Sequence, residues 1–383
     1  MMNKKDSILK ITGYDNFKCI ADKCKFTCCE GWDINVDEDT FNNWKSHESK
    51  FNYILKNLKV KNSGEKKEYF IDKETHDKCP LLDEKGLCEI VKNHGEEYIS
   101  LTCQSFPRIK NKFKDREELS LSCACPEVVE IISNIEGKIN MISEECNNYL
   151  ESSLEFKIRE ALVNIIKQDE LSLDYKLIIS FQMLLTILEN RHMNERKLLK
   201  EVDEYKNKEY LKELIDMYGK MNLDIYESME EINNLFIDIV ENYREVSVLE
   251  EILEDISTFA EEIDIEYLCE QWESYKEVFE KYNDLLENCI ISKVLGSCNS
   301  NEIEEIVMSF QLIILEYLLV RYAGFLKYSI SENEIVDIKD IKDYIVAFSR
   351  IISNNSEAVI DFISEGFDNE ILEMGYICFI SLY

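Results

Sequence analysis

The chain has little proline, histidine and glycine for its length. Its 383 residues include 3 prolines, 4 histidines and 11 glycines, and the last proline is Pro126. The scattered glycines form no GxGxxG loop, which disfavours a doubly wound nucleotide-binding fold. Because proline interrupts helices, its absence after position 126 permits long uninterrupted ones there.

Positive charge is also scarce. The chain has 44 basic and 77 acidic residues, a formal net charge of -33 and a pI near 4.6. A field of this sign repels phosphate, so we expect no nucleic-acid partner. The first 126 residues contain 22 basic and 22 acidic groups, and the remaining residues therefore carry the whole excess.

Two kinds of long apolar segment are missing. Residues 1–14 mix charges with short apolar pairs and contain no continuous apolar stretch typical of a secretory signal. The most apolar stretch, residues 306–325, includes Glu316 and Arg321, which is atypical of a membrane span. We therefore expect a cytoplasmic protein without a membrane span, and a buried helix over 306–325.

These differences predict two domains: a cysteine-rich metal-binding module over 1–126 and an acidic all-α helical domain over 127–383. In the second, apolar residues recur every three or four positions, as helices require. Examples are Leu177, Phe181, Leu184 and Leu188. The predicted fold class is thus mainly α, with a loop-rich cysteine/metal module at the N-terminus followed by a large all-α domain.

Glycine and proline divide the first module into short pieces. Residues 41–58 are its one good helical candidate, with Asp39 or Thr40 as a possible N-cap. Residues 61–72 suggest a turn leading into a short strand. A loop-rich backbone of this kind usually needs an internal staple, which thiolates around a metal can supply.

Nine of the fourteen cysteines lie in this module, and in a reducing compartment such density favours metal binding or catalysis over disulfides. The spacing of Cys24 and Cys28 allows two sulfurs to meet around one metal. Cys28 and Cys29 are adjacent, so we expect their side chains to diverge, and either they serve different ions or one of them packs as a small hydrophobe. The predicted metal ligands are Cys19, Cys24, Cys28, Cys29, Cys79, Cys88, Cys103, Cys123 and Cys125.

Zinc and iron–sulfur centres both suit thiolates, and spacing alone does not separate them. Nine thiolates with few histidines favour iron–sulfur. His76 and His94 lie near cysteines and could join the ligands, although an ordinary exposed or core position is favoured for both. The five later cysteines are expected to be ordinary helical residues without partners: Cys146, Cys269, Cys289, Cys298 and Cys378.

Two other side chains are candidates for cofactor binding. Trp32 follows the double cysteine and either lines a ligand pocket or packs as a core tryptophan. Arg108 either binds a carboxylate or a cluster sulfur, or forms an ordinary salt bridge. No catalytic residue can be assigned, because tyrosines and carboxylates are too numerous to choose among.

Several separate motifs together resemble the flagellin lysine-N-methylase family, whose cysteine half is similar to the CxxxCxxCC zinc- or iron-chelating group. The helical segment 345–355 adds a weaker similarity. The chain departs from CxxxCxxCC in its first two gaps, which are one residue longer, and it lacks CxxxCxxC. The motifs are FKC at 17–19, CCEGW at 28–32, CPLLD at 79–83, GLC at 86–88, LTCQSFPR at 101–108, LSC at 121–123 and CPE at 125–127.

The resemblance implies methyl transfer from S-adenosylmethionine to lysine side chains of flagellin. It also implies an iron–sulfur centre, taken here as the 4Fe–4S type with zinc as the alternative. A competing hypothesis is a non-catalytic zinc- or iron-binding protein whose acidic helical half docks a partner.

Overall fold

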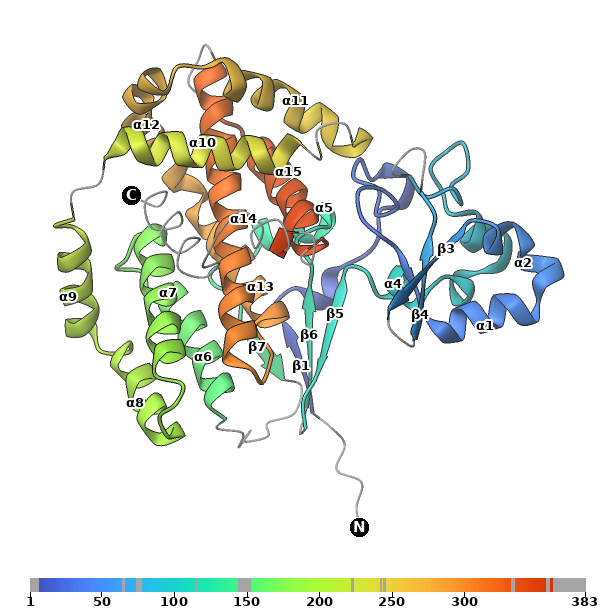
Figure 1. Cartoon of the computed structure of the whole chain (residues 1–383), viewed down its shortest axis with the longest axis horizontal. Helices are drawn as coiled ribbons and strands as arrows, with labels where there is room; N and C mark the ends of the chain where they lie inside the picture. The colour runs from blue at the N-terminus through green and yellow to red at the C-terminus, as the bar shows by residue number, and fades with distance from the viewer. Residues whose placement is uncertain are drawn as a thin grey trace.

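Helices dominate the computed structural model of this chain (Figure 1). In the part that it describes, strands occur only up to Ser143, and the cysteine-rich segments contain short elements joined by loops. The predicted mainly-α fold class is confirmed. The structure describes residues 7–63, 66–73, 78–114, 116–143, 153–221, 224–241, 243, 246–331, 335–355 and 359–360.

The helical half is built around α14 (Ile303–Ile330), which contacts six other helices. Most helices of known start begin at a Ser, Asn or Asp whose side chain accepts a backbone N–H, as N-caps commonly do. The other elements are α6 (Leu154–Ile166), α7 (Leu173–Glu189), α8 (Glu195–Glu204), α9 (Lys208–Tyr218), α10 (Ile225–Glu241), α11 (Ser247–Glu262), α12 (Ile265–Phe279), η4 (Glu280–Tyr282), α13 (Asn283–Ser297), α15 (Ile338–Phe348) and the π-helical turn η5 (Ser349–Ser353).

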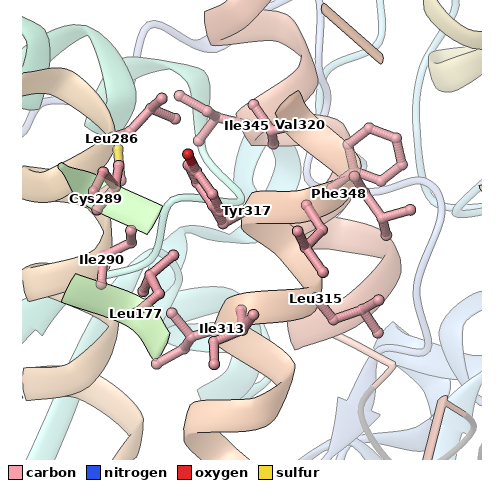
Figure 2. Packing of buried hydrophobic residues seen from close by; sticks show 14 of the residues in the cluster. Leu177, Leu286, Cys289, Ile290, Ile313, Leu315, Tyr317, Val320, Ile345 and Phe348 are labelled. Carbon is pink, nitrogen blue, oxygen red and sulfur yellow. The ribbon is translucent and has the colours of Figure 1, made fainter. Parts of the chain in front are cut away.

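Helix α14 is buried on nearly all sides, as an all-round apolar helix should be. Figure 2 shows Ile313, Tyr317 and Val320 of this helix packed among side chains of neighbouring helices. Its two buried charged residues are paired: the Arg321 guanidinium lies 3.2 Å from Asp174, and Glu316 pairs with Lys293. The expected buried helix over 306–325 is confirmed. Among the described helices, none has the length and apolarity needed to cross a bilayer.

A four-stranded sheet lies beside this bundle in the order β5-β6-β1-β7. Strand β1 pairs in parallel with β6, and the other two pairings are antiparallel. The strands are β1 (Ser7–Ile11), β5 (Arg108–Lys112), β6 (Arg116–Leu121) and β7 (Met141–Ser143).

Helix α13 attaches the sheet to the bundle. The Ser292 hydroxyl donates to the Leu121 carbonyl at 3.1 Å, and Asn111 donates to the Gly296 carbonyl at 2.9 Å. A side chain at Gly296 would lie 3.1 Å from the Ser120 hydroxyl, so glycine permits this close approach. The sheet is therefore fixed against the helical half by α13.

A second, smaller unit lies at the other side of the molecule (Figure 1). It has its own apolar core around Trp44, Phe51 and Ile54. Its elements are η1 (Tyr14–Asn16) and η2 (Ala21–Lys23) in the approach to it, then β2 (Asn35–Val36), α1 (Glu38–Ser46), α2 (Glu48–Leu55), β3 (Leu58–Ser63), β4 (Lys66–Ile71), α3 (Glu89–His94), η3 (Glu96–Tyr98) and α4 (Leu101–Ser105), and α5 (Pro126–Ser133) follows it in the main core.

The local predictions in this region need three corrections. The helix expected over 41–58 is two helices, because the backbone breaks at His47. Its N-cap is Asp37, whose carboxylate accepts from Thr40 N at 2.9 Å, and neither Asp39 nor Thr40 has that role. The strand expected within 61–72 is present as β4, but β3 precedes it and pairs with it, which takes residues 58–63 out of the predicted helix and turn.

The two apolar cores do not divide the chain at residue 126, where its charge and cysteine content change. Ile11, Phe17, Leu121 and Cys125 belong to the main core together with the helices. Cys79 and Leu81 belong to the small core instead. The four-stranded sheet thus shares its core with the helical half, and the boundary at residue 126 stays a prediction from composition.

One buried position makes the packing of α12 on α14 testable. A Cβ atom at Gly324 would lie 2.5 Å from the Tyr275 hydroxyl, which donates to the Arg321 carbonyl at 2.6 Å. We expect Gly324→Ala to lower the free energy of unfolding by about 1–3 kcal/mol, because overpacking forces side chains apart. In a Tyr275→Phe background the loss should be smaller, and equal losses in both backgrounds, measured by denaturant unfolding, would contradict this.

Candidate active site at the junction of the cysteine segments and the helical half

Five of the predicted cysteine ligands gather at the edge of the small core. The Cys28 and Cys29 thiols are hydrogen-bonded to each other, and Cys29 is also bonded to Cys79. The Cys79 amide donates to the Cys29 carbonyl at 2.9 Å, which holds the two segments together. Cys103 interacts electrostatically with both Cys28 and Cys88. The expected divergence of Cys28 and Cys29 is wrong, because the chain turns at these two residues.

Electrostatics differ among these thiols. The hydrogen bond to Cys29, followed by burial, raises the pKa of Cys28 strongly. The bond from Cys28 lowers the pKa of Cys29, but the bond to Cys79 and burial outweigh it and raise that pKa to about 12. The bond from Cys29 lowers the pKa of Cys79 despite burial. Of these three thiols, Cys79 is therefore the one whose pKa is lowered.

Three further cysteines lie toward the helical half. Cys24 and Cys125 interact electrostatically with each other, and Cys24 also with the exposed Cys19. Burial raises the pKa of Cys24 and raises that of Cys125 to about 11. Cys125 is the N-cap of α5, and Pro126 occupies the first helical turn, a position that suits its fixed φ.

The buried Arg350 side chain joins these cysteine segments to η5. Its guanidinium donates to the carbonyls of Phe26 at 2.7 Å, Thr27 at 2.9 Å and Ala124 at 3.0 Å. The carbonyls lie between Cys24 and Cys28 and between Cys123 and Cys125. Burial lowers the pKa of Arg350, and the nearby Cys28 and Cys24 act against that shift. Sequence reasoning noted segment 345–355 only as a similarity and gave Arg350 no role.

Cys123 is separated from the other predicted ligands. Its thiol is hydrogen-bonded to Cys289 of α13, and both residues are buried. Figure 2 shows Cys289 between Leu286 and Ile290 on this helix. The expectation that Cys289 has no partner is therefore wrong, because α13 packs against the end of β6. Cys269 and Cys298 lie on α12 and at the end of α13, whereas Cys146 and Cys378 lie outside the described residues.

The two histidine candidates have different outcomes. The His94 ring packs edge-on against Phe51, with centroids 4.9 Å apart, and also lies near Tyr98. The half-buried ring thus packs as an ordinary side chain, in keeping with the position that the sequence favoured. His76 lies outside the described residues.

A pocket of about 310 Å³ opens where the cysteine segments meet the helical half. Trp32 and Arg108, the two predicted cofactor residues, both line it, as does Cys123. The Trp32 indole donates to the Cys28 carbonyl at 2.9 Å and packs 5.5 Å from the Phe106 ring. The remaining lining residues are Thr102, Ser105, Pro107, Ile109, Leu121, Ser122, Lys293, Gly296, Ser297, Ser353 and Asn354.

Arg108 lies on the exposed side of this pocket, where its guanidinium stacks 4.8 Å from the Phe17 ring centroid. Lys293 lies on the buried side and pairs with Glu316. Its ammonium also donates to Ser349 at 2.6 Å, and Ser349 and Ser353 both donate to Glu316. Burial alone would lower the pKa of Lys293, but Glu316 and Cys123 raise it, so the side chain is a cation.

The donor chemistry of the cysteines suits a thiolate-bound metal, since soft sulfur ligands select zinc and iron–sulfur centres. Within the described part of the chain, no three Cys, His, Asp or Glu side chains converge as a ready metal site. Metal binding by the nine cysteines stays a prediction.

Comparison with known families identifies the class of protein. The model of the FliB lysine N-methylase C-terminal domain matches residues 159–380, which is more than half of the chain. The chain belongs to this family. The match includes Lys293, Glu316 and Arg350, and it confirms the family resemblance read from the sequence.

Individual relatives are similar over a shorter length. The chain is 35% identical over 123 residues to a lysine-N-methylase of Salmonella choleraesuis, which is 31% of this chain and 30% of that protein. The corresponding protein of Salmonella typhimurium is 35% identical over 122 residues, again 30% of its length. The flagellar biosynthetic protein FliU of Salmonella muenchen is 35% identical over 123 residues, 72% of its length. No solved structure matches the chain.

The Arg350 contacts can be tested by their contribution to stability. We expect Arg350→Met to lower the free energy of unfolding by about 3 kcal/mol or more, because three buried carbonyls lose a charged donor. Arg350→Lys should lose less, although lysine cannot reproduce the planar fork. Arg191→Met is the matched control: this exposed arginine pairs with Glu304 and donates to the Leu188 carbonyl, and it should contribute less than about 1 kcal/mol. Equal losses for Arg350→Met and Arg191→Met in denaturant unfolding would contradict the assignment.

Proposed function

We propose that this chain transfers methyl groups from S-adenosylmethionine to lysine side chains of flagellin. Family membership and the names of the relatives support lysine methylation in a flagellar setting. The chain spans 30% of the two lysine-N-methylases it resembles, so the activity, substrate and partner of the whole protein are proposed here. The acidic charge of the helical half supports attraction of a lysine-bearing protein.

The pocket at the junction is the observation that carries this proposal. It has an aromatic wall of Trp32 and Phe106, and it has a cation, Arg108, at its exposed side. Aromatic rings suit an adenine ring, and the cations that line the pocket suit the carboxylate at the other end of the molecule. Its volume lies at the lower end of the usual range for small-molecule sites. These features fit S-adenosylmethionine as the ligand.

Methylation also requires a neutral lysine amine beside the donor methyl group. Arg108 and Lys293 are the charged residues that line the described pocket, and both are cations. Like charges nearby disfavour an ammonium group and so favour the neutral amine. Trp32 and Phe106 exclude water from one wall, and binding in this pocket orients the amine toward the donor.

The nine cysteines would hold the metal centre, for which we propose iron–sulfur of the 4Fe–4S type, with four thiolates to each cluster, and zinc as the alternative. An iron–sulfur cluster would supply electron transfer and an open coordination position, whereas zinc would supply a Lewis acid. Arg350, which lies among Cys24, Cys28 and Cys125, would stabilise their ionised form. Trp32 would fix one ligand segment through its bond to the Cys28 carbonyl.

Metal binding predicts a contrast among cysteine variants. We expect Cys28→Ser and Cys79→Ser to lose the bound iron or zinc and to lower solubility, because the loops depend on ligation for folding. Cys298→Ser should keep the metal, since Cys298 is buried at the end of α13, away from the other cysteines in sequence. Metal analysis of anaerobically purified full chains checks this, and equal metal content in all three variants would contradict it.

Methyl transfer is tested with the full chain, flagellin and deuterium-labelled S-adenosylmethionine under anaerobic conditions. Mass spectrometry should find labelled lysines on flagellin. Arg108→Ala should reduce the rate about tenfold or more through lost donor binding, whereas the exposed Arg191→Ala should not. A folded, metal-containing chain that leaves flagellin unlabelled would overturn the proposed function and favour a non-catalytic metal protein.

A further inference from the structure

The described lining of the junction pocket contains hydrogen-bond donors and no carboxylate. Both charged residues that line the described pocket, Arg108 and Lys293, are cations, although the chain carries a formal charge of -33. Hydroxyl groups of Thr102 and Ser122 line the same space, and no carboxylate does. This composition suits an anionic group of a ligand.

Lys293 retains a donor for such a group. Its ammonium has three N–H bonds, and it donates to Glu316 and to Ser349. The third N–H finds no acceptor among the described residues. Glu316 also accepts from Ser349 and Ser353, so the lysine is held in place on α13 while it faces the pocket.

Asn354 supplies a second donor. Its side-chain nitrogen Nδ2 is buried and has no hydrogen-bond partner in the described part of the chain. Asn354 directly follows η5, the π-helical turn that carries Arg350, and it lines the pocket with Lys293. A buried donor without an acceptor costs free energy, which a ligand oxygen can recover.

We propose that Lys293 and Asn354 form a carboxylate-binding subsite at the buried side of this pocket. The inference rests on the proposed function, because it assigns the carboxylate to the amino-acid end of S-adenosylmethionine. The ammonium and the amide N–H each donate to a carboxylate oxygen, an arrangement with the strength of charge-assisted hydrogen bonds. The nucleoside end then lies toward Trp32 and Phe106. The same chemistry could accept a carboxylate of the protein substrate, and the choice of probes separates these two sources.

The test is calorimetric binding to the full chain, purified anaerobically. The probes are S-adenosylhomocysteine, which has the carboxylate, methylthioadenosine, which lacks the amino-acid group, and free methionine. We expect S-adenosylhomocysteine to bind at least about tenfold more tightly than methylthioadenosine. Equal affinity of these two nucleosides for the folded wild-type chain would overturn the donor assignment, and with it the proposal.

Two variants identify the residues. Lys293→Met should weaken S-adenosylhomocysteine about 10- to 100-fold and leave methylthioadenosine unchanged. Asn354→Leu should weaken S-adenosylhomocysteine binding about tenfold. This substitution breaks no hydrogen bond of the Asn354 side chain in the described structure. It therefore keeps the test possible if Lys293→Met, which leaves Glu316 without its cation, fails to fold. Lys212→Met, an exposed lysine on α9, is the matched control. Unchanged binding of S-adenosylhomocysteine to folded Asn354→Leu, together with Lys293→Met where that variant folds, would overturn the proposal.

Methionine separates failure of this proposal from failure of the proposed function. If methionine binds and Asn354→Leu weakens it, the carboxylate subsite stands even when flagellin remains unlabelled. If flagellin is labelled but no probe depends on Lys293 or Asn354, the subsite is wrong and the methylation stands. If the variants impair only the Michaelis constant for flagellin, the carboxylate belongs to the protein substrate, which overturns the assignment to the methyl donor.

Discussion

The contact between the cysteine segments and the helical half depends on one buried cation, Arg350, whose guanidinium donates to three carbonyls from two distant segments. Phe26 and Thr27 precede the double cysteine, and Ala124 lies between Cys123 and Cys125. Because the acceptors are uncharged, the guanidinium charge is not neutralised by a carboxylate in these contacts and acts on the neighbouring thiols. The same side chain therefore holds both cysteine segments on the helical half and sets the electrostatics around them. Its position on a π-helical turn is typical of functional sites in helical proteins.

Helices α13 and α14 extend this arrangement from the junction into the bundle. Lys293 of α13 and Glu316 of α14 form a buried pair whose remaining hydrogen bonds involve Ser349 and Ser353 of η5. Burying two charges is costly unless each is paired and hydrogen-bonded, and removing one partner is more costly still. The pair thus couples three elements: the helix that carries the sheet, the central helix and the turn that carries Arg350. Cys289, on the same helix as Lys293, brings α13 into contact with Cys123.

The sequence predicts the architecture well and the site only in part, for identifiable physical reasons. Apolar periodicity and the absence of proline after Pro126 are local signals, so they predict the helices and the burial of 306–325. Trp32 and Arg108 were found because they flank cysteine motifs, and the structure places both in one pocket. Lys293, Arg350 and Asn354 carry no comparable local signal, since a lysine or arginine on a helix is ordinarily solvated. Their roles arise from contacts between segments that are far apart in sequence, as does the pairing of Cys289 with Cys123. The error at Cys28 and Cys29 has another cause: adjacent side chains diverge in extended backbone, but here the chain turns.

The negative charge of the helical half acts at long range, whereas the cations of the pocket act at contact distance, and the two affect the proposed donor differently. The excess of 33 carboxylates lies beyond residue 126 and attracts cations over roughly the Debye length of 8 to 10 Å. The pocket itself is lined by cations, which act at contact distance on a carboxylate. S-adenosylmethionine carries a sulfonium and an ammonium besides its carboxylate, so the long-range field would attract this proposed donor while the pocket would orient one end of it. Methyl transfer removes the sulfonium charge, and the product, S-adenosylhomocysteine, no longer has a net attraction to the acidic half. A pocket that held the donor by its carboxylate alone would release donor and product equally slowly. An acidic helical half together with a cationic pocket would therefore favour exchange of product for the proposed donor.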